Sequence, residues 1–140
     1  MKVLVDTSVW VDFFNGHVSA ERNALSALFD SPHEICTCGV VLSEVFQGIY
    51  RLQERVRLAE LFLDLELLET KGVELYFRAA DLHRALRLRG KTIRSTIDCL
   101  IAILAEENGC ALLARDRDLE TILQSGALQL SRWPPETPPS

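Results

Sequence analysis

Four carboxylates stand singly in apolar or turn-forming surroundings, at Asp6, Glu44, Asp98 and Asp116. Each lies where we expect a strand or helix to begin or end, and Asp6 directly follows the apolar run of residues 2–5. Isolated acids in such positions are difficult to explain as solvated surface charges. Carboxylate oxygens are the ligands that Mg²⁺ and Mn²⁺ prefer in proteins. Together the four acids predict a divalent metal site, and with it metal-assisted hydrolysis of a phosphodiester bond.

The chemistry expected of such a site follows from the charge of its ligands. A divalent cation would neutralise the carboxylates, polarise a phosphate group and lower the pKa of a water molecule, so that hydroxide can attack. Without the cation, neighbouring carboxylates repel one another and titrate as a coupled group. This reaction needs no serine, histidine or cysteine triad, and no such triad is evident in the sequence.

Two of the four acids also have simpler explanations. Ser95 and Asp98 have the spacing of a capping box, in which Asp98 would only accept a hydrogen bond from the Ser95 amide. Glu44 lies on a polar strip with Ser43 and Gln47, as an ordinary exposed glutamate would. We prefer the functional interpretation because the four acids together fit one geometry.

The composition is that of a globular protein with one domain. The chain has 140 residues, of which 48% are hydrophobic and 25% charged, and this length can fold without disulfides. No apolar run reaches the roughly 18 residues that span a bilayer. Asp6 interrupts the short apolar N-terminus, so we expect neither a membrane segment nor a signal peptide.

The cysteines and histidines give no sign of a structural metal or a disulfide framework. No CxxC pair occurs, and the histidines lack the spacing of zinc ligands. We therefore expect buried free thiols in a reducing cytoplasm. The four cysteines are Cys36, Cys38, Cys99 and Cys110.

The net charge of −5 and the pI of about 5.2 argue against a broad surface for nucleic acid. The basic residues are nevertheless clustered, since no acid occurs between Leu82 and Ile97. This segment is either a solvated helix face with its following loop or a local patch that contacts phosphates. Its basic residues are Arg84, Arg87, Arg89, Lys91 and Arg94.

Strand and helix patterns alternate along the chain and predict an α/β fold with a mainly parallel central sheet flanked by helices. Ligands bind outside the carboxyl ends of such strands, where Asp6 and Asp116 would both stand. We expect one domain over residues 1–131 and a Pro-rich tail, residues 132–140, that frays. Strands are predicted at residues 2–5, 34–37, 65–68, 111–114 and 128–130. Helices are predicted at residues 8–15, 19–30, 40–50, 51–64, 73–89, 96–107 and 119–124.

The chain resembles a known family in four segments: MKVLVDTSVWVDFF at the start, SEV around Glu44, TIRSTIDCLIA around Asp98 and LLARDRDL around Asp116. These segments are similar to those of PIN-domain ribonucleases, most closely the VapC toxins of toxin–antitoxin pairs. The resemblance implies a single PIN-like domain with Mg²⁺- or Mn²⁺-dependent endoribonuclease activity on RNA. It also implies inhibition by a small VapB-like antitoxin and a homodimer within the toxin–antitoxin complex.

The resemblance also implies roles for individual residues. Asp6 and Asp98 would be the principal metal ligands, and Asp116 would complete the acidic site, often through water. Glu44 would orient or activate the attacking water. Either Thr7 or Ser8 would donate a hydrogen bond to a ligand carboxylate.

Asp118 is an extra acid for which the sequence leaves the role open. It could simply be the N-cap of the next helix.

Three other classes remain as alternatives. A PIN-like scaffold would bind RNA or protein without cleaving it, although the intact acids argue against this. A receiver-like or haloacid-dehalogenase-like phosphotransfer protein also has acids at strand ends, but the latter class would need a second aspartate where the chain has Ser8. A structure-specific DNA nuclease would need insertions that grip a duplex, for which 140 residues leave no room.

Trp10, Phe13 and Phe14 follow the Asp6 motif at helical spacing. One helix face cannot easily bury all three together with Val9, so we expect at least one of them to line a groove. A helical antitoxin segment could dock in such a groove through apolar side chains.

Overall fold

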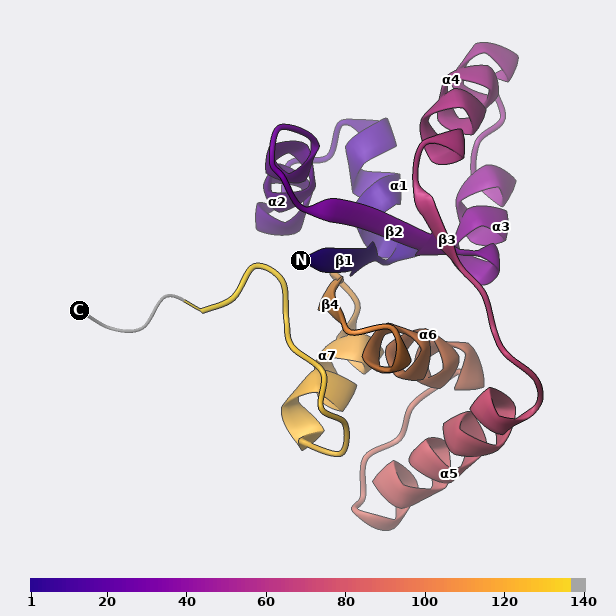
Figure 1. Ribbon diagram of the computed structural model, residues 1–140, viewed down its shortest axis with the longest axis vertical. Helices are drawn as coiled ribbons and strands as arrows, with labels where there is room; N and C mark the ends of the chain where they lie inside the picture. Colours follow the sequence, from indigo (N-terminus) through magenta and orange to yellow (C-terminus); the bar gives the residue numbers. More distant parts are fainter. Residues whose placement is uncertain (137–140) are drawn as a thin grey trace.

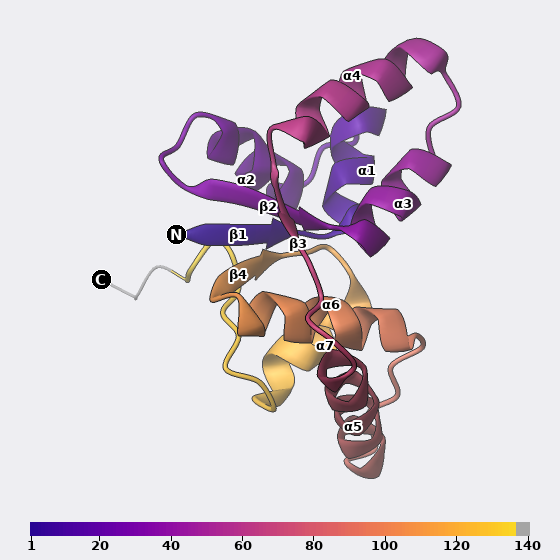
Figure 2. The same ribbon diagram turned by 45° about the vertical axis from the view of Figure 1, so that its right-hand side comes forward.

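The computed structural model describes residues 1–136, which form a parallel sheet between two layers of helices (Figures 1 and 2). The strands are β1 (Lys2–Val5), β2 (Glu34–Cys38), β3 (Glu66–Leu68) and β4 (Cys110–Leu113), in the order β3-β2-β1-β4. All three ladders between them are parallel. Helices cover both faces, which explains why β1 and β4 are nearly continuous apolar runs. The predicted α/β fold is confirmed.

The first four helices lie on one face of the sheet and the last three on the other (Figures 1 and 2). The first group is α1 (Thr7–Asn15), α2 (Ala20–Phe29), α3 (Gly39–Gln47) and α4 (Leu52–Leu63). The second group is α5 (Glu74–Leu88), α6 (Thr96–Glu107) and α7 (Arg117–Ser125). None of the helices among residues 1–136 has the length and apolar character that crossing a membrane requires.

Helix α6 is the central helix of its layer, as its apolar sequence predicts. It contacts α5, α7 and β4, and its buried side chains are Cys99 and those of residues 101–105. Ser95 is its N-cap, with the Ser95 hydroxyl accepting from the backbone N–H of Ile97 at 3.1 Å. Because α6 runs back along the sheet toward the start of β4, its N-terminus lies at the carboxyl edge of the strands.

Trp10 belongs to the core rather than to a groove. Its side chain is fully buried and packs against Phe62, with ring centroids 4.7 Å apart, and against Phe13 and Phe14. Phe13 and Phe14 are only partly buried. Helix α1 therefore turns its tryptophan inward and leaves its two phenylalanines at the boundary with solvent.

The four cysteines are buried and free, as predicted.

The strand predicted at residues 128–130 is wrong. The structure instead pairs the next residues with the outer edge of β4, in an isolated parallel bridge between Leu112 and Arg132. The N–H of Leu112 donates to the Ser131 carbonyl and the N–H of Trp133 donates to the Leu112 carbonyl, both at 2.9 Å. The first residues of the predicted tail are therefore bonded to the sheet, while residues 137–140 lie outside the described part.

Candidate active site

The four acids singled out in the sequence come from four different elements at the carboxyl edge of the sheet. Asp6 follows β1 and is the N-cap of α1, and Asp116 follows β4 and is the N-cap of α7. These strands are parallel neighbours, and the Asp6 N–H donates to the Leu113 carbonyl at 2.9 Å. Glu44 lies in the second turn of α3 and Asp98 in the first turn of α6.

Asp6 is buried and held in place by Ser8. Its Oδ2 accepts hydrogen bonds from the Ser8 hydroxyl at 2.6 Å and from the Ser8 backbone N–H at 3.1 Å. Burial raises the pKa of Asp6, the bonds from Ser8 oppose this, and the charge of Asp116 raises it further, so the net shift is upward. Ser8 therefore orients the Asp6 carboxylate, which is one of the two hydrogen-bond roles implied by the family resemblance.

Glu44 is more exposed than Asp6, and its carboxylate accepts a hydrogen bond from Thr7 as that of Asp6 does from Ser8. The Thr7 hydroxyl donates to Glu44 Oε1 at 3.3 Å, which links α1 to α3. Partial burial, followed by the charges of Asp6 and Asp116, raises the pKa of Glu44. Glu44 is thus close enough to the other acids to respond to their charge.

The Asp98 side chain does not form the capping-box bond to the Ser95 amide that was its simpler explanation. The N-cap bond of α6 is made by Ser95, and among the described residues no donor is bonded to the Asp98 carboxylate. Burial raises the pKa of Asp98 to about 7, with further contributions from the charges of four other acids. In order of size these are Asp116, Asp6, Asp118 and Glu44. The five acids therefore form one electrostatic cluster.

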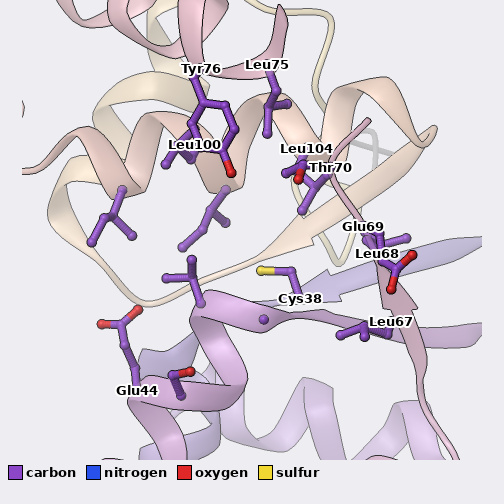
Figure 3. Close-up of a pocket in the computed structure, with 15 residues that line it drawn as sticks. Cys38, Glu44, Leu67, Leu68, Glu69, Thr70, Leu75, Tyr76, Leu100 and Leu104 are labelled. Atoms are coloured by element: carbon purple, nitrogen blue, oxygen red, sulfur yellow. The ribbon is translucent and has the colours of Figure 1, made fainter. Parts of the chain in front are cut away.

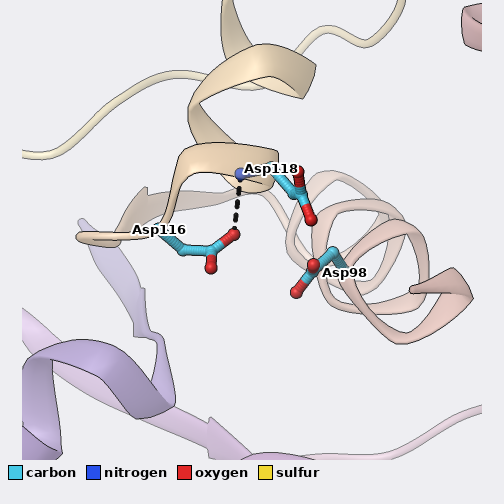
Figure 4. A group of neighbouring side chains, drawn as sticks. All are labelled: Asp98, Asp116 and Asp118. Carbon is cyan, nitrogen blue, oxygen red and sulfur yellow. Dashed lines mark hydrogen bonds between the residues drawn. The ribbon is translucent and has the colours of Figure 1, made fainter. Parts of the chain in front are cut away.

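Asp118 is the member whose place in this cluster the sequence did not reveal. One carboxylate oxygen from each of Asp98, Asp116 and Asp118 lies within 4.8 Å of the others (Figure 4). Asp118 is not the N-cap of α7, because the Asp116 Oδ2 fills that position by accepting from the N–H groups of Asp118 and Leu119, each at 2.9 Å. The sequence signal that could have placed Asp118 in the site is its position two residues after Asp116, just beyond the buried strand β4.

The spacing and chemistry of Asp98, Asp116 and Asp118 fit a divalent cation. Three carboxylates offer hard oxygen ligands, and a cation among them would favour the ionised form of Asp98 that the neighbouring charges now oppose. Of the two metal ligands predicted from the family resemblance, Asp98 belongs to the group of three and Asp6 does not. The acids open onto a cavity of about 310 Å³. It is lined by Glu44, Arg94, Ser95, Ile97, Asp98, Asp116 and Asp118.

Arg94 is the member of the basic segment that lies at the acidic cluster. Its backbone N–H and its Nε both donate to Asp118 Oδ2. The other four basic residues are exposed on the last turns of α5 or just after it and do not line this cavity. Among them, Arg89 donates to the Ser125 carbonyl of α7 at 3.3 Å.

An apolar groove of about 740 Å³ adjoins the acidic cavity and shares Glu44 and Ile97 with it. The groove runs between α3 on one side and α5 and α6 on the other, with β3 at its far end (Figure 3). Tyr76 and Leu100 point into it from the helices, opposite Cys38 (Figure 3). A ligand in the groove would therefore lie directly beside the acids.

Comparison with known proteins identifies the family. The PIN domain family model matches residues 3–122. Ribonuclease VapC11 of Mycobacterium tuberculosis and the VapC ribonuclease Mb1587 of Mycobacterium bovis are each 32% identical over 132 residues, which cover 94% of this chain and 98% of each relative.

Solved structures show the same fold at lower identity. VapBC2 from Rickettsia felis, bound to a DNA fragment from its promoter, matches with a TM-score of 0.68 and 23% identity, covering 87% of this chain and 93% of that one. VapBC-1 from nontypeable Haemophilus influenzae matches with a TM-score of 0.68 and 16% identity, covering 95% and 98%. The chain belongs to the PIN domain family and, within it, to the VapC ribonucleases.

Proposed function

We propose that this protein is the toxic component of a toxin–antitoxin pair and acts as a Mg²⁺- or Mn²⁺-dependent endoribonuclease. The observation that carries the proposal is the gathering of Glu44, Asp98, Asp116 and Asp118 around one cavity at the carboxyl edge of the sheet. Asp6 lies close enough for its charge to raise the pKa of Asp98. The curated relatives are named ribonucleases. A structural neighbour, VapC20 of Mycobacterium tuberculosis, is described as a toxin that cleaves the sarcin–ricin loop.

The catalytic residues in this proposal are Asp6, Glu44, Asp98 and Asp116. Asp6 and Asp98 are the proposed metal ligands. The carboxylate oxygens of Asp98, Asp116 and Asp118 lie within 4.8 Å of one another, so Asp116 and Asp118 could share in the site. When bound, the ion supplies positive charge that offsets the carboxylates and the phosphate and lowers the pKa of water. Ser8 keeps the Asp6 carboxylate oriented through its hydroxyl group.

Glu44 is suited to take the proton from the attacking water. It is the most exposed of the four acids, and its pKa is raised by burial and by Asp6 and Asp116, which brings a carboxylate closer to the range of a working general base. As the water oxygen bonds to phosphorus and the bond to the leaving oxygen breaks, the proton would reside on Glu44. The Thr7 hydroxyl donates to the Glu44 carboxylate and helps to position it.

The proposed partner is a VapB-like antitoxin, and the proposed setting is the cytoplasm, with the toxin as a homodimer within the complex. Support comes from the structural neighbours, which are VapBC toxin–antitoxin complexes, and from the apolar groove beside the acids. Co-expression with the product of the adjacent gene, followed by co-purification, tests this part.

A cleavage assay tests the central claim. The purified protein is incubated with total RNA in the presence of Mg²⁺, Mn²⁺ or EDTA. We expect discrete cleavage products with either metal and none with EDTA. RNA binding by the wild type without cleavage under any metal condition would favour the alternative, a scaffold that has kept the acids but not the activity.

A further inference from the structure

Arg115 connects the two loops that carry Asp6 and Asp116. It lies between β4 and α7, directly before Asp116. Its backbone N–H donates to the Ser8 hydroxyl at 3.0 Å, and its Nη1 donates to Asp12 Oδ2 at 2.9 Å. One residue therefore contacts α1 at two places, and these places are one helical turn apart.

The first contact links the Asp6 carboxylate to the backbone beside Asp116 through a single hydroxyl group. Ser8 has one hydroxyl proton, which it donates to Asp6 Oδ2 at 2.6 Å, so its oxygen is left to accept from the N–H of Arg115. This fixes the direction of both bonds. The carboxylate of Asp6 and the backbone next to Asp116 are thereby both bonded to the same oxygen.

The second contact anchors the Arg115 side chain to a rigid part of the fold. Asp12 is only 8% exposed, and its Oδ2 also accepts from the hydroxyl of Ser19, the N-cap of α2, at 3.1 Å. The Arg115 side chain itself is 46% exposed. Charge-assisted bonds of this kind are the stronger and geometrically more specific ones, so the buried aspartate holds the arginine against α1.

We infer that Arg115 is a positioning residue that sets the distance between the Asp6 and Asp116 carboxylates through its ion pair with Asp12. The inference rests on the proposed function, since the acids matter here as a metal and substrate site. Arg115 does not line the acidic cavity. Its effect on metal binding and activity would therefore come from the shape of the segment between β4 and α7, which carries Asp116. Outer groups that orient ligands typically contribute about 10- to 100-fold to metal affinity or activity.

A half-exposed arginine beside a nuclease site could instead contact an RNA phosphate directly. Asp12 separates these two roles, because a buried acid cannot bind phosphate. If Arg115 acts by positioning, removing either partner of the ion pair should have the same effect, and removing both should add nothing. If Arg115 acts on RNA, only its own removal should matter.

The experiment is a double-mutant cycle with Arg115→Met, Asp12→Ala and the double variant. Two quantities are measured: Mn²⁺ affinity by calorimetry without RNA, and kcat and KM on one RNA. We expect each single variant to bind Mn²⁺ about tenfold more weakly and to lose kcat about 10- to 100-fold at unchanged KM. The double variant should match the singles. Arg115→Lys, which keeps the charge, should recover part of the loss.

Arg78→Met is the matched control, because it removes two ion pairs, to Glu106 and Glu107, without touching the site. It should leave Mn²⁺ affinity and kcat unchanged. If Asp12→Ala does not fold, Asp12→Asn replaces it, since it keeps the shape and removes the charge.

Two results would overturn the inference. One is a raised KM in Arg115→Met with wild-type behaviour in the Asp12 variant, which would show direct contact with RNA. The other is wild-type Mn²⁺ affinity and kcat in folded variants that are merely less stable. Since the Mn²⁺ titration needs no RNA, it decides the question even if the wild type proves not to cleave.

Discussion

The backbone N–H and the side-chain Nε of Arg94 donate to the same oxygen of Asp118, at 3.2 and 3.1 Å. The arginine thus brings positive charge to a cluster of acids, although its side chain is 72% exposed. Only one of its guanidinium nitrogens is engaged by Asp118, and the others remain able to donate to a further group. Arg94 is therefore the residue through which the basic segment can act at the site.

The first prediction concerns the salt dependence of RNA binding. Arg94→Ala should weaken binding and reduce the slope of log affinity against log salt by about 0.7, the value for one phosphate contact on a single strand. Arg87→Ala, an exposed position away from the cavity, is the matched control. Filter binding between low and high salt measures both slopes. Equal slopes for wild type and Arg94→Ala would show that Arg94 only neutralises Asp118.

The second prediction concerns catalysis. Asp98→Asn keeps the shape of the side chain but removes its charge, and residues that act as one unit are non-additive. We expect RNA cleavage with Mg²⁺ to fall by about 100-fold or more, with the fold intact by circular dichroism. Asp81→Asn, an exposed acid on α5, should cleave normally. RNA cleavage at the wild-type rate by Asp98→Asn would contradict the assignment of Asp98 as a catalytic residue.

The third prediction concerns stability against pH in EDTA. The pKa of Asp98 is raised from its ordinary 3.8 to about 7 in the folded protein, and the pKa values of Asp6 and Glu44 shift in the same direction. The folded state therefore holds protons that the unfolded state has released, so the free energy of unfolding should fall as pH rises from about 4 to about 7. Above pH 7 the contribution of Asp98 should be constant.

Thermal unfolding across this pH range measures the effect. Asp98→Asn should show a shallower fall than the wild type, whereas Asp81→Asn should show the wild-type slope. Millimolar Mn²⁺ should raise the midpoint at pH 7.5 by mass action. Two results would contradict a shared acidic site: the same pH dependence of unfolding in wild type and Asp98→Asn, or an unfolding midpoint that does not change with Mn²⁺.

Much of the fold and site could be predicted because the relevant signals are local. Short stretches rich in apolar residues predicted the positions of β1, β2 and β4, and the acids after β1 and β4 marked the carboxyl edge. Helix α6 was predicted with the bounds that it has, since Ser95 caps its start and its apolar face is wide.

The missed features depend on contacts between distant segments. Asp118 joins the cluster because α7 begins at Arg117, two residues earlier than its apolar pattern indicated, so that Asp116 is the cap. Its partner Arg94 is 24 residues away along the chain. The bonds from Leu112 to Ser131 and Trp133 likewise cannot be found from a local pattern, and the alternating Leu128, Gln129 and Leu130 gave a false strand.

The fourth prediction concerns Trp10, whose burial excludes it from a docking surface. Trp10→Ala should lower the free energy of unfolding by about 3–5 kcal/mol, because it leaves a cavity beside Phe62. Trp10→Phe should cost clearly less, since the Trp10 Nε1 is buried without a hydrogen-bond partner and its loss leaves no polar group behind. Urea unfolding of both variants checks the order. Near-wild-type stability in Trp10→Ala would contradict the core assignment.

Strand β4 lies at the end of the sheet, where unpaired backbone groups can template pairing with another molecule. Here the outward N–H and carbonyl of Leu112 are occupied by Ser131 and Trp133, and an ion pair between Arg132 and Glu120 fastens the same segment to α7. This short stretch therefore covers the β4 edge of the sheet. A chain ending at residue 130 should form larger assemblies in light scattering than the full chain does, and the residues after 130 would then act as protection against aggregation.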